Sequence, residues 1–461
     1  MDDLTTGAFR IRFLGAAETV TGSKYLLTND KTNVLVDCGL FQGLKELRLK
    51  NWDRFPIDPK LIDAIILTHA HIDHSGYIPR LIKEGFKGQI FCTSATLALC
   101  RILLPDTGYL QEEEAEWLSR KKFSKHSPAL PLFTEKEAEQ ALEQFVAKNF
   151  DEAFDVADGL RATFKYAGHI LGAAIAIVEA GQIKMAFSGD LGRQNDSILF
   201  PPAPIPSVDY LVVESTYGNR QHKPVNPINE FEIEINEGLK NNGVILIPAF
   251  AVGRAQSLMY YLSVLRKSGR IPDVPMYLNS PMATKVTNLF REFKKLHKLT
   301  DKDCNEMDEG VYYIRSVEES KSLNEKKGPM IIISASGMAT GGRIIHHLKA
   351  FVSNPSTTVI LAGFQAVGTR GRALQDGAKE IKIFNELIPV NARIRMLEST
   401  SAHADYSEIL EWLSQSKITP PKKVFITHGE VDAAHKMKDH IVERFNWICE
   451  VPKQNQEFVL E

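Results

Sequence analysis

The chain has 461 residues, which is too long for one ordinary hydrophobic core, so we expect at least two domains. A content of 44% hydrophobic and 24% charged residues is that of a soluble globular protein and excludes extensive disorder. The 55 basic and 57 acidic side chains nearly cancel, which excludes a polycation that attracts nucleic acid from a distance. A polyanionic substrate would therefore need a local basic groove.

Neither a signal peptide nor a membrane span is predicted. The first residues form no basic and apolar leader, and no run reaches the roughly 18 apolar residues of a membrane helix. We therefore expect a cytoplasmic protein without membrane contact. The cysteines are scattered and form no CxxC pair, which argues against disulfides and against a thiolate zinc site. Any bound metal must use histidine and carboxylate ligands.

Short apolar strands that end at a polar residue recur along the chain. Four of them end at a possible metal ligand: residues 34–36 before Asp37, 65–68 before His69, 185–189 before Asp190, and 424–427 before His428. Strands that finish at one edge of a buried sheet deliver the loops that follow them to one place. The pattern therefore predicts a single site.

The pattern of predicted strands and helices changes near Val208. From there, strands at 210–213, 244–247, 330–334 and 358–361 alternate with helical stretches such as 254–267 and 343–352. This alternation predicts a parallel sheet flanked by helices. Because His403 and His428 lie beyond it, we expect a first domain of residues 1–207 completed by 391–461, with 208–390 inserted as a second domain.

The motif at residues 68–76 places His69, His71, Asp73 and His74 within six residues. His69 and His71 are two residues apart at a strand end, so an extended backbone points both imidazoles the same way. The turn that follows places Asp73 and His74 near the two histidines. A polar loop with coincidental histidines is the alternative interpretation.

Further donors later in the chain weaken that alternative. His169 and Asp190 are each flanked by glycines, which permit tight turns. Imidazole and carboxylate donors without thiolate suit Zn²⁺ in an open catalytic site. Two metals bridged by Asp190 would use every donor: His69, His71 and His169 on one metal, and Asp73, His74 and His428 on the other. A metal pair favours phosphoryl chemistry because it stabilises both the attacking and the leaving oxygen.

This motif set resembles that of the metallo-β-lactamase superfamily, which implies an α/β fold of two sheets sandwiched between helices (αββα). Asp37 matches the first motif of the superfamily, a carboxylate that orients the ligands. Three more motifs resemble those of the β-CASP nucleases: Glu214 in motif A, His403 in motif B and His428 in motif C. The likeness covers essentially the whole chain. It implies a sandwich with an inserted parallel-sheet α/β (β-CASP) domain, as in the compact bacterial and archaeal members that are similar to the mRNA 3′-end processing endonuclease.

The resemblance also implies an activity. It predicts a ribonuclease with two Zn²⁺ per chain that cuts RNA internally and leaves 5′-phosphate and 3′-hydroxyl ends. A histidine in motif C, here His428, is typical of members that act on RNA. Asp73 is expected to help aim the nucleophile, and His403, oriented by Glu214, to stabilise the phosphate or protonate the leaving group. Homodimers occur among related proteins, and the sequence leaves the oligomeric state open.

A glycine-rich turn is the best candidate for a phosphate contact. It follows the apolar strand at 330–333 and opens a helix, so its amides and an arginine could cradle a phosphate: Ser336, Gly337, Gly341, Gly342 and Arg343. Three more arginines are candidates for contact with the RNA backbone: Arg254, Arg370 and Arg372. An ordinary turn and a solvated charged surface are the alternative interpretations.

Three other functions remain open at this stage. A small-molecule metallohydrolase such as a thioesterase would need neither the insertion nor His403. A DNA-processing β-CASP nuclease would share the ligand set, and only cleavage of matched RNA and DNA separates the two. A non-catalytic RNA-binding scaffold subunit would have no reason to keep a complete set of metal ligands.

Overall fold

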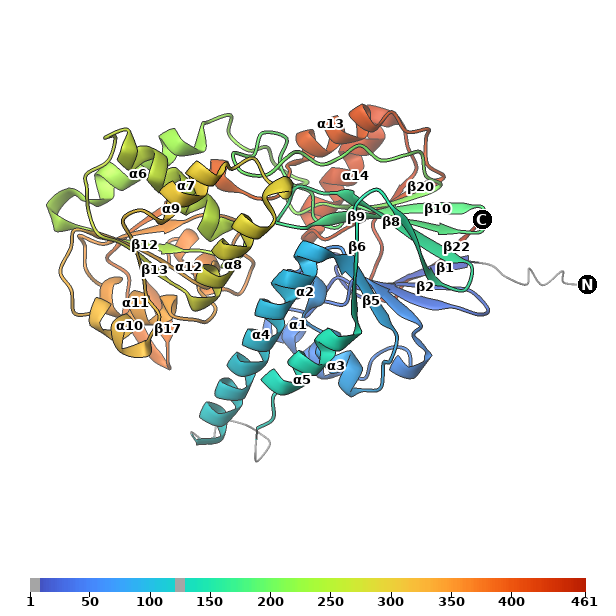
Figure 1. Cartoon of the computed structure of the whole chain (residues 1–461), viewed down its shortest axis with the longest axis horizontal. Coiled ribbons are helices and arrows are strands. Elements are labelled where there is room, and N and C mark those ends of the chain that lie inside the picture. The colour runs from blue at the N-terminus through green and yellow to red at the C-terminus, as the bar shows by residue number, and fades with distance from the viewer. Residues whose placement is uncertain (1–8, 121–128) are drawn as a thin grey trace, which may run out of the picture. The chain divides into compact units, whose positions relative to one another are not determined.

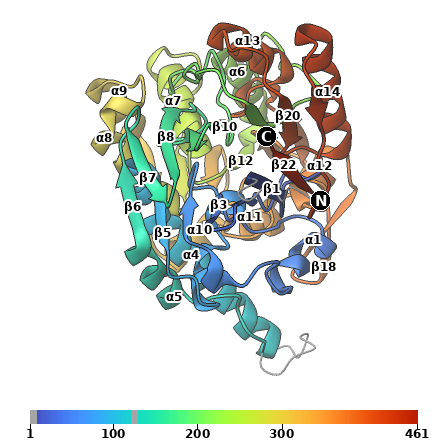
Figure 2. The same cartoon turned by 90° about the vertical axis from the view of Figure 1, so that its right-hand side faces the viewer.

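A computed structural model describes residues 9–120 and 129–461 of the chain. The chain divides into two compact units (Figure 1; Figure 2 gives the view turned by 90°). The larger unit consists of Met1–Asn195, Pro201–Gln221 and His403–Glu461, and the smaller unit of Asp196–Phe200 and His222–Ala402. The smaller unit is therefore inserted between segments of the larger one.

The first sheet of the larger unit has seven strands in the order β22-β1-β2-β3-β4-β5-β6. Strands β3 to β6 run parallel to one another, whereas β22, β1, β2 and β3 pair antiparallel. The last strand of the chain thus pairs with the first. The strands span Phe9–Phe13 (β1), Tyr25–Thr28 (β2), Asn33–Val36 (β3), Ala64–Ile66 (β4), Gln89–Thr93 (β5), Phe145–Lys148 (β6) and Glu457–Leu460 (β22).

The second sheet also has seven strands, in the order β21-β20-β11-β10-β9-β8-β7. The strands span Ala153–Ala157 (β7), Leu160–Tyr166 (β8), Ala174–Ala180 (β9), Ile183–Phe187 (β10), Tyr210–Glu214 (β11), Lys423–Thr427 (β20) and Cys449–Glu450 (β21). The sequence pattern assigned β11 to the inserted sheet, but β11 pairs in parallel with β10 and β20. A continuous apolar run looks the same in any buried parallel strand, so the pattern alone could not choose the sheet.

The two sheets pack face to face around one hydrophobic core. Phe13 from the first sheet contacts Phe425 from the second, with ring centroids 5.0 Å apart. The α-helices of this unit, within the residues that the structure describes, are α1 (Lys45–Leu49), α2 (Ile72–Ser75), α3 (Ile78–Lys83), α4 (Ser94–Arg120), α5 (Glu135–Ala141), α13 (Tyr406–Ser416) and α14 (Val431–Phe445). Figure 1 shows the sheets between these helices. The predicted αββα sandwich is confirmed.

The smaller unit is built on a six-stranded sheet in the order β14-β13-β15-β12-β16-β19, and every pairing in it is parallel. Its strands span Val244–Pro248 (β12), Met276–Asn279 (β13), Val311–Tyr313 (β14), Met330–Ser334 (β15), Thr358–Leu361 (β16) and Arg393–Met396 (β19), and Glu380–Ile383 (β17) and Glu386–Pro389 (β18) form a separate hairpin. The predicted parallel-sheet α/β insertion is confirmed.

Helices alternate with these strands along the chain. They span Pro227–Gly238 (α6), Arg254–Lys267 (α7), Pro281–Glu292 (α8), Asp301–Asp308 (α9), Val317–Leu323 (α10), Ile344–Phe351 (α11) and Arg370–Gln375 (α12). The predicted helix at 254–267 is α7, and the one at 343–352 is α11. Throughout the two described ranges, every helix is too short or too polar to cross a membrane, including the 27-residue α4.

The core of the inserted sheet gives a stability prediction. Ile332 is fully buried on β15, whereas Ile233 on α6 is 62% exposed. We expect Ile332→Ala to lower the free energy of unfolding by about 2–5 kcal/mol, because it leaves a cavity in close-packed surroundings. The matched control Ile233→Ala should change it by less than about 0.5 kcal/mol. Denaturant unfolding of both variants tests this, and equal effects would contradict the assigned core.

Candidate metal centre

The predicted ligands lie where strands of the two sheets of the larger unit end. His69 follows β4 in the first sheet, and Asp190 and His428 follow β10 and β20 in the second. His71 is the residue before the first turn of α2, and His169 lies between β8 and β9. The close backbone packing that their glycines permit is visible at Gly192, where an added Cβ would lie 1.9 Å from the carbonyl oxygen of Gly168.

One group of donors consists of His69, His71, His169 and Asp190, whose ligand atoms all lie within 4.8 Å of one another. The Nε2 atoms of His69 and His169 each lie 3.2 Å from Nδ1 of His71. Oδ2 of Asp190 lies 3.3 Å from Nε2 of His69 and 3.4 Å from Nε2 of His169.

A second group consists of Asp73, His74 and His428, also within 4.8 Å of one another. The Nε2 atoms of His74 and His428 are 3.2 Å apart, and Nε2 of His428 lies 3.5 Å from Oδ2 of Asp73. The other oxygen of Asp190, Oδ1, lies 3.2 Å from Nε2 of His74. The Asp190 carboxylate thus presents one oxygen to each group.

The protonation states of the first group suit a metal ion. Burial lowers the pKa of His69 to about 3 and that of His71 to about 4, and it holds the pKa of His169 well below its usual value. Neutral imidazoles present lone pairs, which is the state that binds a metal. Oδ1 of Asp190 is buried and accepts no hydrogen bond from the described residues. A buried carboxylate beside neutral imidazoles is stabilised by a cation, so the donor set fits a metal cofactor.

Asp37 holds one member of the second group, His74, through a hydrogen bond. Its carboxylate accepts hydrogen bonds from the backbone N–H of Thr68 at 2.8 Å and from the Thr68 hydroxyl at 2.9 Å. Nδ1 of His74 donates to it at 2.8 Å, which leaves Nε2 of His74 to face Asp190. Gly39 packs so closely that an added Cβ would lie 1.6 Å from the backbone oxygen of Asp73. Asp37 is therefore placed to fix the ring of His74 and belongs to neither donor group.

His403 and Glu214 form a third arrangement beside the two groups. Nδ1 of His403 lies 3.1 Å from Oε2 of Glu214, the buried last residue of β11, and 4.0 Å from Oδ2 of Asp190. Burial opposes protonation of His403, but the carboxylates of Glu214 and Asp190 outweigh it and raise the pKa to about 9. The two carboxylates therefore favour the protonated form of the His403 imidazole.

Thr216 was not identified from the sequence. Its hydroxyl donates to Oε2 of Glu214 at 2.6 Å and lies 3.1 Å from Nδ1 of His428, so it links the His403 pair to the second donor group. The signal available in the sequence was its position two residues after Glu214, in the turn that follows β11.

The predicted phosphate contacts lie in the smaller unit, where most of their polar groups bond internally. The guanidinium of Arg343 donates to Oδ1 of Asn279 at 2.8 Å, and that of Arg372 pairs with Asp376 at 2.9 Å. Arg370 donates to backbone carbonyls, and Arg254 is buried. The amides of Thr340 and Gly341 donate to the hydroxyl of Ser336, and Gly337 and Gly342 belong to the same turn. These residues remain predictions as RNA contacts.

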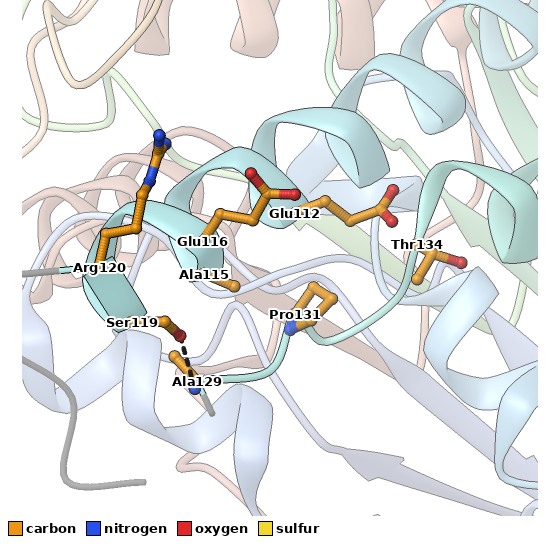
Figure 3. Close-up of a pocket in the computed structure, with 8 residues that line it drawn as sticks. All are labelled: Glu112, Ala115, Glu116, Ser119, Arg120, Ala129, Pro131 and Thr134. Carbon is orange, nitrogen blue, oxygen red and sulfur yellow. Dashed lines mark hydrogen bonds between the residues drawn. The ribbon is translucent and has the colours of Figure 1, made fainter. Parts of the chain in front are cut away.

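A cavity of about 510 Å³ lies elsewhere in the larger unit, beside the end of α4 (Figure 3). In Figure 3, the Ser119 hydroxyl accepts a hydrogen bond of 3.0 Å from the backbone N–H of Ala129. The lining residues are Glu112, Ala115, Glu116, Ser119, Arg120, Ala129, Pro131 and Thr134. None of them is a candidate functional residue, so this cavity is separate from the donor groups.

Comparison with known proteins agrees with the fold and the donor set. Models of three families match the chain: the metallo-β-lactamase superfamily at residues 19–219, the β-CASP domain at 255–374, and a Zn-dependent metallo-hydrolase RNA specificity domain at 387–452. The fold and the site define a metallohydrolase of the metallo-β-lactamase superfamily. Within that class, the chain belongs to the β-CASP family.

Three relatives resemble this chain along most of its length. It is 35% identical over 429 residues to a ribonuclease of Thermus thermophilus, which covers 91% of this chain and 93% of the relative. It is 32% identical over 428 residues to an RNase J-like protein of Methanocaldococcus jannaschii, at 91% and 92% coverage. It is 30% identical over 458 residues to a transcription termination factor of Methanosarcina mazei, at 94% and 69% coverage.

The position of Asp37 gives a test of the centre. We expect Asp37→Asn to weaken metal binding about 10- to 100-fold, because His74 loses the charged acceptor that fixes its ring. Competition with a chelator of known affinity measures the change. The control Asp155→Asn alters an aspartate whose side chain is 87% exposed and should leave the affinity unchanged. An Asp37→Asn protein that holds metal as tightly as the original would refute the assigned role of Asp37.

Proposed function

We propose that this protein is a zinc-dependent ribonuclease that hydrolyses RNA phosphodiester bonds internally and leaves 5′-phosphate and 3′-hydroxyl ends. The observation that carries the proposal is the Asp190 carboxylate, which presents one oxygen to each of two donor groups. The ribonuclease names of the relatives and the matched RNA specificity domain support RNA as the substrate.

The two donor groups would hold two zinc ions. His69, His71 and His169 would hold one ion, and Asp73, His74 and His428 the other, and Asp190 would offer one carboxylate oxygen to each group. When bound, a zinc pair acidifies a water molecule and neutralises charge on the phosphate oxygens.

Asp73 is the residue best placed to aim the attacking water. Its side chain is 20% exposed, whereas that of its neighbour His428 is only 4% exposed. Burial alone would raise the pKa of Asp73, but the hydrogen bond to His428 and the charge of His74 hold it below its usual range. The carboxylate is therefore ionised and can accept a hydrogen bond from the water that attacks phosphorus.

His403 supplies the proton for the leaving group. Its Nδ1 faces Glu214, so Nε2 is the nitrogen that can donate to the departing 3′ oxygen or to a non-bridging oxygen. Glu214 is held in turn by the backbone N–H of Leu191 at 2.6 Å and by the Thr216 hydroxyl. Because both Glu214 oxygens are engaged, the orientation of the His403 ring is set before substrate arrives.

Metal dependence is the first expected outcome. The purified protein should contain about two zinc ions per chain, and exhaustive chelation or Asp73→Asn should each abolish RNA cleavage. The exposed control Asp30→Asn should cleave normally. Cleavage that survives both chelation and Asp73→Asn would contradict the proposed chemistry.

The mode of cutting is read from RNA labelled at each end in turn. Early internal fragments are expected, whereas early mononucleotides would indicate a 5′ exonuclease. Matched DNA should be cut more slowly than RNA, and equal or faster cutting of DNA would replace the ribonuclease assignment with a DNA-processing one. A protein that binds RNA but holds no zinc and cuts neither substrate would be a scaffold.

His403 and Glu214 should act as a unit. We expect His403→Gln and Glu214→Gln each to lower kcat by about 10²- to 10⁴-fold, because proton donation to the leaving group is lost or misdirected. The double variant should be little worse than the more damaging single variant. His435→Gln, which changes a half-exposed histidine on α14, is the control. Additive losses would show that the two residues act independently.

A further inference from the structure

The turn that follows β11 carries Arg220 and pairs with the segment that begins at His403. The backbone of Tyr217 forms an isolated parallel β-bridge with Asp405, and the N–H of Tyr406 donates to the carbonyl of Tyr217 at 3.3 Å. The Tyr217 ring lies 6.3 Å from the His403 ring, measured between centroids. This turn is thus tied to the segment that carries the proposed proton donor.

The turn is held firmly against α14. The N–H of Gly218 donates to the carbonyl of Ser215 at 3.0 Å, and an added Cβ on Gly218 would lie 2.2 Å from the backbone oxygen of Ala433. The side-chain amide of Asn219 donates to Asp432, in the first turn of α14, at 2.6 Å. Because these contacts fix the backbone that immediately precedes Arg220, the fold restricts where its side chain can lie.

Arg220 is exposed, and its guanidinium lies 4.8 Å from the centroid of the Tyr217 ring. Among the residues that the structure describes, no carboxylate forms an ion pair with it, in contrast to Arg193, Arg161 and Arg372. A guanidinium held over an aromatic face keeps its N–H donors available and has lost part of its side-chain freedom in advance. Its charge is therefore preorganised for an anion.

We propose that Arg220 binds the RNA phosphate next to the scissile one. Successive contacts connect the metal ligands to it: 4.0 Å from Asp190 to His403, 6.3 Å from His403 to Tyr217, and 4.8 Å from Tyr217 to Arg220. A guanidinium binds two phosphate oxygens at once, and contacts of this kind position a strand without reading its sequence. This role rests on the proposed ribonuclease function, because it requires a substrate with more than one phosphate.

The matched variants are Arg220→Met, which keeps the bulk of the side chain, Arg220→Lys, which keeps the charge, and the control Arg161→Met on β8. Each is assayed on a short single-stranded RNA and on bis(p-nitrophenyl) phosphate, which has a single phosphodiester. We expect Arg220→Met to lower the ratio of kcat/KM for RNA to kcat/KM for the small diester about tenfold, mainly through KM. Arg220→Lys should recover part of the loss, and Arg161→Met should leave the ratio unchanged.

RNA affinity measured against salt gives an independent readout. Loss of one phosphate contact should reduce the slope of log affinity against log salt by about 0.7 for single-stranded RNA. An unchanged ratio and slope, or an equal loss on both substrates as expected for a purely structural residue, would overturn the proposal. Failure of the original protein to cleave RNA would refute the ribonuclease function. The salt dependence of RNA affinity would then still test whether Arg220 binds a phosphate.

Discussion

The site depends on one buried carboxylate among imidazoles. Asp190 is almost completely inaccessible, and nitrogens of five histidines lie within 4.0 Å of its oxygens: His69, His74, His169, His403 and His428. An isolated buried carboxylate is costly, so this one requires positive charge beside it. Burial raises its pKa, but the surrounding histidines hold the pKa well below its usual range. Cations that bind there would take over that role.

The packing of the two sheets brings the carboxylates and imidazoles of the site together. Asp37 and His69 leave strands of the first sheet, whereas Asp190, Glu214 and His428 leave strands of the second. Only when the sheets pack face to face do the two sets of loops meet. The aromatic core holds the two sheets together and therefore helps to position the metal-ligand candidates at their strand ends. Substitutions in this core are expected to displace the strand ends and so to disturb the positions of the donor side chains.

Arginines show why residue type alone is a weak guide to binding. Arg343 stands in a glycine-rich turn that favours phosphate contact, and Arg372 was a further candidate for contact with the RNA backbone. Their guanidinium groups nevertheless bond to Asn279 and Asp376. Arg220 stands in no such motif, yet it is exposed over the ring of Tyr217, which lies 6.3 Å from the ring of His403. Whether a charged group is already satisfied depends on neighbours that are distant in sequence.

The sequence by itself predicted the parallel insertion and the candidate ligands, because strand periodicity and donor spacing are local properties. The αββα sandwich was implied by the resemblance of its motifs to those of the metallo-β-lactamase superfamily. It placed α7 correctly but assigned β11 to the wrong sheet, because an apolar run does not encode its partner strands. Only the tertiary structure decided that Asp190 faces both donor groups and that Thr216 joins Glu214 to His428. It also decided which arginine side chains already have hydrogen-bond or ion-pair partners within the protein. Those facts are distances between residues far apart in the chain, and packing alone sets them.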